Sequence, residues 1–106
     1  MVIEVRRTEV RVDEANDLLN QAGLPNLNSM KILQGGWDNT NILLTLSDAS
    51  KVVLKVWNAN TVEEVRRVVA RHCHLDEHGI PTAVPIQLAN GSLIAEKDGM
   101  AWTLLP

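Results

Sequence analysis

The long amphipathic segment from Thr61 to His78 constrains the fold more than any other feature of the chain. Valines recur along it at helical spacing and form one apolar stripe. Thr61 can cap the segment together with Glu64 three residues later, and Gly79 followed by Pro81 ends it. The sequence therefore predicts a long helix with one apolar face, which has to pack on another layer of secondary structure.

Three strand-like segments precede this helix and can supply that layer. They are Ser29 to Leu33, Asn39 to Leu46 and Lys51 to Trp57. A polar turn sequence at residues 47–50 separates the last two at hairpin distance. Strand alternation puts Val53, Lys55 and Trp57 on one face of the third segment. A lysine between two large apolar neighbours has to reach water or meet a partner.

A second helix is predicted near the N-terminus, from Val12 to Ala22, because apolar residues recur at helical spacing and Gly23 follows. Three more strands are predicted after the long helix. They are Pro85 to Ala89 and Ser92 to Glu96 around an Asn90-Gly91 turn, and Met100 to Leu105 after an Asp98-Gly99 turn. The order predicts a single α+β domain over residues 1–106. We expect an antiparallel sheet of about five strands, with the long helix packed on it and an N-terminal helix.

Charge and composition exclude several classes of function. The 106 residues carry a formal net charge of -3 without a basic face, so no nucleic-acid partner is expected. No apolar run approaches the roughly 18 residues needed to span a bilayer, and the charged N-terminus lacks the apolar segment of a signal peptide. The single cysteine, Cys73, cannot form an intrachain disulfide. We therefore expect a cytoplasmic protein without a membrane partner.

The first candidate site is the turn between the first two strands, Gly35-Gly36-Trp37-Asp38-Asn39-Thr40-Asn41. Two glycines let the backbone approach an anion closely, and successive free N–H groups in such a turn form a concave anion site. The polar residues that follow can brace the turn through side-chain hydrogen bonds. A plain β-turn has the same composition, and the turn lacks the Gly-Lys-Ser/Thr ending of a Walker A loop.

The second candidate site is Lys55, with Glu63 and Glu64 on the helix that follows. A lysine on a rigid strand is a good point charge for phosphates, and kinases hold such a lysine with a carboxylate. The alternatives are a lysine that protects a sheet edge from aggregation and glutamates that cap the helix. One glutamate cannot fill both roles at once. Trp57, on the same face as Lys55, is expected in the core or in a cleft.

A histidine cluster near the end of the long helix suggests a metal site, because His74 and His78 lie one turn apart beside His72 and Cys73. Histidines also suit the C-terminal end of a helix, and no second pair of ligands is evident in the sequence. We therefore predict no metal site here.

Taken together, the order of these features resembles the N-terminal lobe of the aminoglycoside phosphotransferase, choline kinase and homoserine kinase superfamily, which is related to protein kinases. The similar segments are KILQGGWDNTNILLTLSDASKVVLKVW at residues 31–57, EEVRRVVARHCHLDEHGIPTAVPI after it, and AWTLLP at residues 101–106. The GG-x-x-NTN turn and the Gly79-Ile80-Pro81-Thr82 segment are especially similar to homoserine kinases. The resemblance covers about residues 12–106.

This resemblance implies a binding site for ATP with Mg²⁺. Gly35, Gly36, Asn39 and Asn41 would form the loop that covers the phosphates, and Lys55 would contact the α- and β-phosphates. Leu33 and Val53 would pack against the adenine, whose edge would bond to the Thr103 carbonyl and the Leu105 N–H. Trp102 would stand at the back of the pocket. The family glutamate should fall near Val68, which cannot pair with a lysine, so Glu64 one turn earlier is the expected substitute.

The catalytic motifs of this superfamily, H-G-D-x-x-x-x-N and I-D-x, do not occur in the sequence. We therefore expect an inactive fragment, with the catalytic residues, the Mg²⁺ ligands and the acceptor site in a second lobe. Two functions stay open. One is the ATP-binding lobe of a kinase for a small alcohol or amine such as homoserine, choline or an aminoglycoside. The other is a non-catalytic binding module with the same fold. An uncovered sheet face also predicts self-association as a homodimer.

Overall fold

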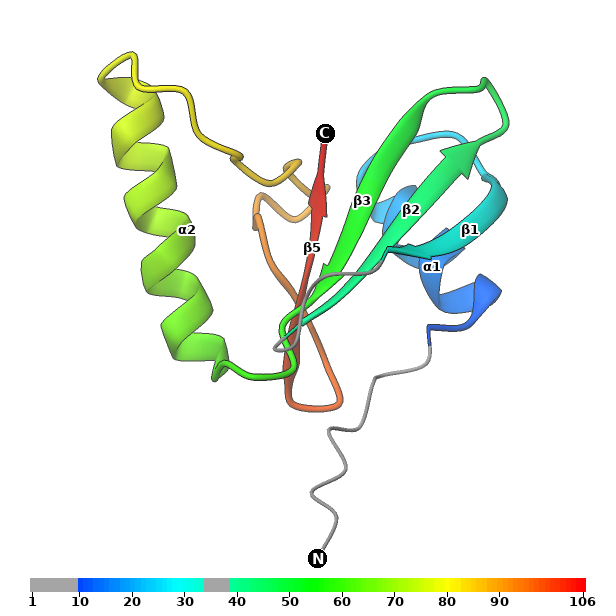
Figure 1. The fold of residues 1–106 in the computed structure, drawn as a ribbon, viewed down its shortest axis with the longest axis horizontal. Coiled ribbons are helices and arrows are strands. Elements are labelled where there is room, and N and C mark those ends of the chain that lie inside the picture. Colours follow the sequence, from blue (N-terminus) through cyan, green and yellow to red (C-terminus); the bar gives the residue numbers. More distant parts are fainter. Residues whose placement is uncertain (1–9, 34–38) are drawn as a thin grey trace, which may run out of the picture.

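The computed structural model describes residues 10–33 and 39–106, which form two helices and five strands (Figure 1). The elements are α1 (Val12–Gln21), β1 (Leu27–Leu33), β2 (Thr40–Leu46), β3 (Lys51–Val56), α2 (Val62–Glu77), β4 (Ala95–Lys97) and β5 (Met100–Leu105). All pairings are antiparallel and the strand order is β1-β2-β3-β5-β4. The predicted α+β class, the five-stranded sheet and both helices are confirmed. No helix in these ranges is long and apolar enough to cross a membrane.

The main core lies on the face of the sheet that α1 covers, and α1 lies behind β1 to β3 in Figure 1. Alternate residues of the strands point into it, and they meet Ala15, Leu18 and Leu19 of the helix. The strand residues are Ile42, Leu44, Leu46, Val52, Leu54, Val56, Trp102 and Leu104. The core is therefore aliphatic apart from one tryptophan.

The second helix, α2, packs on the opposite face and reaches only one side of the sheet. It stands beside β5 in Figure 1 and buries Val65 and Val69 against Trp57 and Ala101. Among the described residues, no helix covers the middle of that face, over β2 and β3. We call this uncovered area the open face.

The capping box predicted at the start of α2 is confirmed. The Glu64 N–H donates to the Thr61 Oγ1 over 3.1 Å, and the Thr61 N–H donates to the Glu64 carboxylate over 2.9 Å. These hydrogen bonds lower the pKa of Glu64, first through the backbone of Thr61 and then through its side chain. Two orphan donors of the first helical turn are satisfied in this way.

Replacing Thr61 with alanine is expected to lower the free energy of unfolding by about 1 kcal/mol, because the cap loses its acceptor. Urea denaturation followed by circular dichroism measures this change. The matched control is Thr61→Ser, which keeps the hydroxyl and should cost much less. Equal losses in the two variants would show that the hydroxyl contributes nothing.

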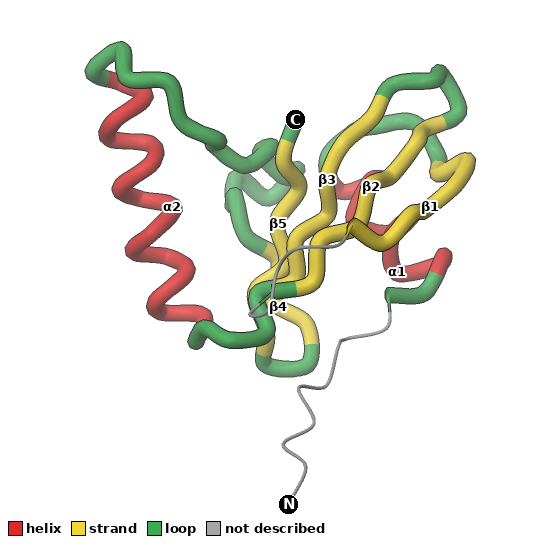
Figure 2. Tube along the Cα trace, in the orientation of Figure 1, coloured by secondary structure: helices red, strands yellow, loops and turns green. Residues whose placement is uncertain are grey.

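The prediction of a strand from Pro85 to Ala89 is wrong, because this segment is a loop between α2 and β4 (Figure 2). Its backbone N–H groups find three different partners instead of one neighbouring strand. Ile86 donates to the Leu104 carbonyl, Leu88 to the Ser92 carbonyl and Ala89 to the Gln21 carbonyl, over 2.7, 2.8 and 2.6 Å. The first residue, Pro85, has no N–H to donate.

The strand predicted from Ser92 to Glu96 is shorter than expected, since β4 begins only at Ala95. The Ser92 hydroxyl bonds the N–H and the carbonyl of Ile94, which takes these groups out of the ladder. The hairpin to β5 is as predicted. Asp98 and Gly99 both have positive φ angles, 53° and 77°, as a two-residue type I′ turn requires.

Candidate functional site

The register of the sheet brings the predicted site residues into two rows on the open face. One row runs Leu33, Asn41, Lys55 and Thr103 across β1, β2, β3 and β5. The next row runs Lys31, Leu43, Val53 and Leu105. Directly paired residues of antiparallel strands have Cβ atoms about 5 Å apart on the same face. Residues that are far apart in the sequence therefore line one surface.

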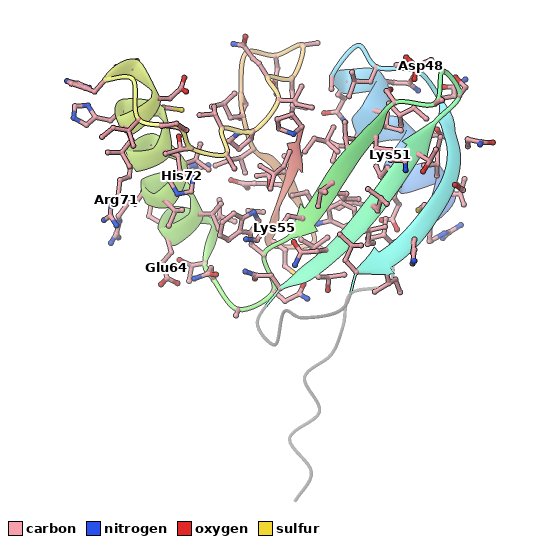
Figure 3. The ribbon with its side chains drawn as sticks, turned by 45° about the horizontal axis from the view of Figure 1, so that its top comes forward. Asp48, Lys51, Lys55, Glu64, Arg71 and His72 are labelled. Carbon is pink, nitrogen blue, oxygen red and sulfur yellow. The ribbon has the colours of Figure 1, made fainter. Side chains whose placement is uncertain are left out.

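Lys55 lies in the middle of this surface, on the side of β3 that faces α2 (Figure 3). Its ammonium lies over the Trp57 ring, 4.1 Å from the ring centroid. Burial of the side chain lowers the pKa of Lys55 below its ordinary value. Lys55 forms no ion pair with any residue in 10–33 or 39–106. Lys55 thus lies on a strand, with its ammonium over an aromatic face.

The ring under Lys55 is itself held in place. The Trp57 Nε1–H donates to the Thr103 Oγ1 over 3.0 Å, and both side chains are buried. Thr103 is also the residue that pairs with Lys55 across β3 and β5. Lys55, Trp57 and Thr103 therefore form one connected group. Lys55 and Thr103 are site residues predicted from the sequence. For Trp57 the sequence predicts a place in the core or in a cleft, on the same face as Lys55, and no role in the site.

The two glutamates at the start of α2 have other partners in this structure. The Glu64 carboxylate is bound to the Thr61 N–H, at the beginning of the helix (Figure 3). Glu63 forms an exposed ion pair with Arg66 over 3.1 Å. Val68, near which the family glutamate was expected, packs with the apolar residues under α2. In the described ranges α2 thus offers Lys55 no carboxylate, and the cap is the role that Glu64 fills.

The predicted phosphate loop is described only in part. Gly35 and Gly36 lie outside the described residues. Asn39 lies at the end of that turn, where its side-chain oxygen accepts a hydrogen bond from the Ala59 N–H over 3.4 Å. Next to it the Asn58 amide donates to the Thr40 hydroxyl over 2.6 Å. These two bonds tie the start of β2 to the segment that joins β3 to α2.

Comparison with known proteins identifies the family. Residues 29–106 match the model of the phosphotransferase enzyme family. The chain belongs to this family. Two curated relatives are the homoserine kinases of Polaromonas naphthalenivorans and Bradyrhizobium diazoefficiens, which are 32% and 29% identical to it over 92 residues. The matches cover 87% of this chain but only 29% and 28% of those enzymes, so the chain spans less than a third of their length.

The fold is also found in a solved phosphotransferase structure. Spectinomycin phosphotransferase, in complex with ADP and spectinomycin, superposes with a TM-score of 0.70 over 93% of this chain and 30% of its own chain. The sequence identity is 16%, so this likeness concerns the fold. The fold of this phosphotransferase-family chain is therefore that of a kinase-like N-terminal lobe, as the sequence predicted.

The structure places the Trp102 side chain on the face of the sheet opposite Lys55. Trp102 pairs with Val56 in the sheet and packs in the main core under α1, whereas Lys55 pairs with Thr103 on the other face. A shift of one residue along β5 puts a side chain on the other face of the sheet, because successive side chains alternate.

Trp102 lines a cavity of about 370 Å³ between α1 and β4. A second cavity, of about 320 Å³, lies between α2 and residues 92–96. Neither cavity includes Lys55.

Two histidines at the C-terminal end of α2, His74 and His78, contact each other. The His74 and His78 rings have centroids 4.3 Å apart, and the His78 Nδ1 lies 2.8 Å from the His74 carbonyl oxygen. His72 lies 3.4 Å from the Ala83 carbonyl oxygen. Within residues 10–33 and 39–106, no three His, Cys, Asp or Glu side chains come together as a ligand set for a metal.

Proposed function

We propose that this chain is the ATP-binding lobe of a small-molecule kinase, with the open face as its nucleotide site. The observation that carries the proposal is the row in which Asn41, Lys55 and Thr103 lie side by side on three adjacent strands. A cation fixed on the central strand of such a row suits the α- and β-phosphates of a nucleotide. ATP would supply the phosphoryl group to be transferred.

The residues around Lys55 fit the other parts of ATP. Leu43, Val53 and Leu105 are partly exposed apolar side chains in the adjacent row, which suits the flat adenine ring. The backbone groups of Thr103 and Leu105 are proposed to bond the adenine edge, and Gly35, Gly36, Asn39 and Asn41 to cover the phosphates. The two rows contain no carboxylate, so we propose that Mg²⁺ binds with ATP and takes its protein ligands elsewhere.

The relatives favour a hydroxyl group as the phosphate acceptor. Two of them are homoserine kinases, and the solved structure is a spectinomycin phosphotransferase. We propose that the protein containing this lobe phosphorylates a small alcohol such as homoserine. Self-association of the chain through the open face stays a prediction.

A titration with ADP and with adenosine, followed by calorimetry, tests the proposed site. ADP is expected to bind at least tenfold more tightly than adenosine, because only ADP reaches Lys55 with its phosphates. ATP with Mg²⁺ should bind about as tightly as ADP. Equal affinity for ADP and adenosine would contradict the role of Lys55, and no binding of any of them at millimolar concentration would contradict a nucleotide site in this chain.

One observation favours a second function, a non-catalytic binding module. In this structure the carboxylate expected beside Lys55 is engaged in the helix cap, and kinases require the lysine–glutamate pair for phosphoryl transfer. The same titration separates the two functions. A module that no longer binds nucleotides should bind neither ATP nor ADP, while keeping the fold and the thermal stability of the domain.

A further inference from the structure

Among residues 10–33 and 39–106, no carboxylate pairs with Lys55. A flexible ammonium has to be fixed before it can orient a phosphate, and ordering the long side chain of a lysine costs conformational entropy. In the described residues Lys55 forms no ion pair, yet its ammonium lies 4.1 Å from the centroid of the Trp57 ring. Another group therefore has to hold the Lys55 ammonium in position, at least in part.

The indole of Trp57 has the geometry for this task. A cation within about 6 Å of the ring centroid is attracted by the negative face of the ring, and tryptophan gives the strongest attraction of this kind. Lys55 and Trp57 are two residues apart on one strand segment, so the side chains point to the same face. Little desolvation opposes the contact, because Trp57 is only 9% exposed and Lys55 is already partly buried.

The neighbouring strand β5 holds the indole in one orientation. Its Nε1–H donates to the Thr103 Oγ1 over 3.0 Å, and Thr103 is 1% exposed. Trp57 also belongs to the apolar cluster of Val65, Val69 and Ala101 under α2. A buried donor that lost its acceptor would cost free energy, so this hydrogen bond resists rotation of the ring.

We propose that Trp57 is the positioning residue for Lys55. Its indole, oriented by Thr103, holds the ammonium on the open face at the place where kinases use a glutamate from the helix. The role in nucleotide binding rests on the proposed function. The contact between Lys55 and Trp57 is present without a nucleotide. The two can therefore be tested separately.

The contact is measured by nuclear magnetic resonance on protein labelled with ¹³C-lysine. The chain has four lysines, at positions 31, 51, 55 and 97, which single Lys→Arg variants assign. A methylene group held over an indole face is shielded by the ring current, so the ε-CH₂ signal of Lys55 should lie upfield of those of Lys31 and Lys51. Trp57→Phe, which keeps an aromatic face, should keep most of this shift. Trp57→Leu should abolish it.

Two control variants separate this contact from packing. Val69→Ala weakens the same apolar cluster under α2 and leaves the ring in place, so the Lys55 signal should stay upfield. Trp102→Phe alters the tryptophan near Lys97, 5.6 Å from its ammonium, and should also leave Lys55 unchanged. A Lys55 signal at the position of Lys31 and Lys51 in the wild type, or one that does not move in Trp57→Leu, would overturn the proposal.

The affinity for ATP gives the second readout. Trp57→Leu is expected to bind ATP about tenfold more weakly than the wild type, and Trp57→Phe to recover most of the loss. Equal affinities in the wild type and Trp57→Leu would overturn the positioning role. If the wild type binds no ATP, the proposed nucleotide site fails, and the lysine signal alone decides whether Trp57 holds Lys55.

Discussion

Replacing Lys55 with alanine is expected to weaken the binding of ATP and ADP by about 10- to 100-fold. The reason is that a hydrogen bond to a charged group contributes about 1.5 to 3 kcal/mol, and Lys55 is the cation in the middle of the proposed site. The affinity for adenosine should change little, because adenosine has no phosphate. Calorimetric titration of the wild type and the variant with all three ligands measures the difference.

The chain offers a matched control for this experiment. Lys51 begins the same strand, four residues before Lys55, and is exposed next to the β2–β3 turn (Figure 3). It therefore carries the same charge on the same strand, outside the row of Asn41 and Thr103. Lys51→Ala should bind ADP like the wild type. If both variants lost the same amount of affinity, general electrostatic attraction would explain the binding, and Lys55 would have no special role.

A third variant, Lys55→Arg, asks whether charge alone is sufficient. The guanidinium is planar and longer, and it presents a fixed fork of donors where the ammonium is a compact point charge. Because the site positions the ammonium over one indole ring, we expect Lys55→Arg to recover only part of the affinity lost in Lys55→Ala. Full recovery would indicate that the position of the charge is loosely defined.

The parts of this structure that depend on neighbouring residues in the sequence could be predicted. The α2 capping box needs only Thr61 and Glu64, and the common face of Lys55 and Trp57 follows from strand alternation. The pairing of β5 with β3 could not be predicted in this way, because it joins residues about 50 positions apart, such as Lys55 and Thr103. That pairing decides that Thr103, and not Trp102, lies beside Lys55.

The difference between local and distant contacts also explains why Lys55 meets Trp57 and not Glu64. Glu64 had two roles available, a local one in the cap and a distant one beside the lysine, and one carboxylate cannot fill both. The local role is fixed by residues three positions apart, and the structure shows it occupied. From the sequence, Trp57 was expected in the core or in a cleft, on the same face as Lys55, but not in contact with its ammonium. Its contact with Lys55 became evident when the structure gave the 4.1 Å distance and the hydrogen bond to Thr103.

Replacing Leu54 with alanine is expected to lower the free energy of unfolding by about 2 to 5 kcal/mol. Leu54 is 0% exposed on the central strand β3, in the core that α1 covers, so the substitution leaves a cavity that its neighbours cannot fill without moving. Domains are typically stable by only about 5 to 15 kcal/mol, so this variant should unfold at a much lower urea concentration. Urea denaturation followed by circular dichroism measures the midpoint and the slope.

The matched control lies in the same row of the sheet. Ile32 pairs with Ile42, which pairs with Leu54, so the two residues share a face, but Ile32 is on the edge strand β1 and is 58% exposed. Ile32→Ala should cost less than about 1 kcal/mol, because most of its surface is in water in the folded protein as well. A large loss in Ile32→Ala would mean that another surface covers the edge of the sheet in solution. The pairings place both residues in one row on one face of the sheet, so the two variants differ in burial and in strand but not in face.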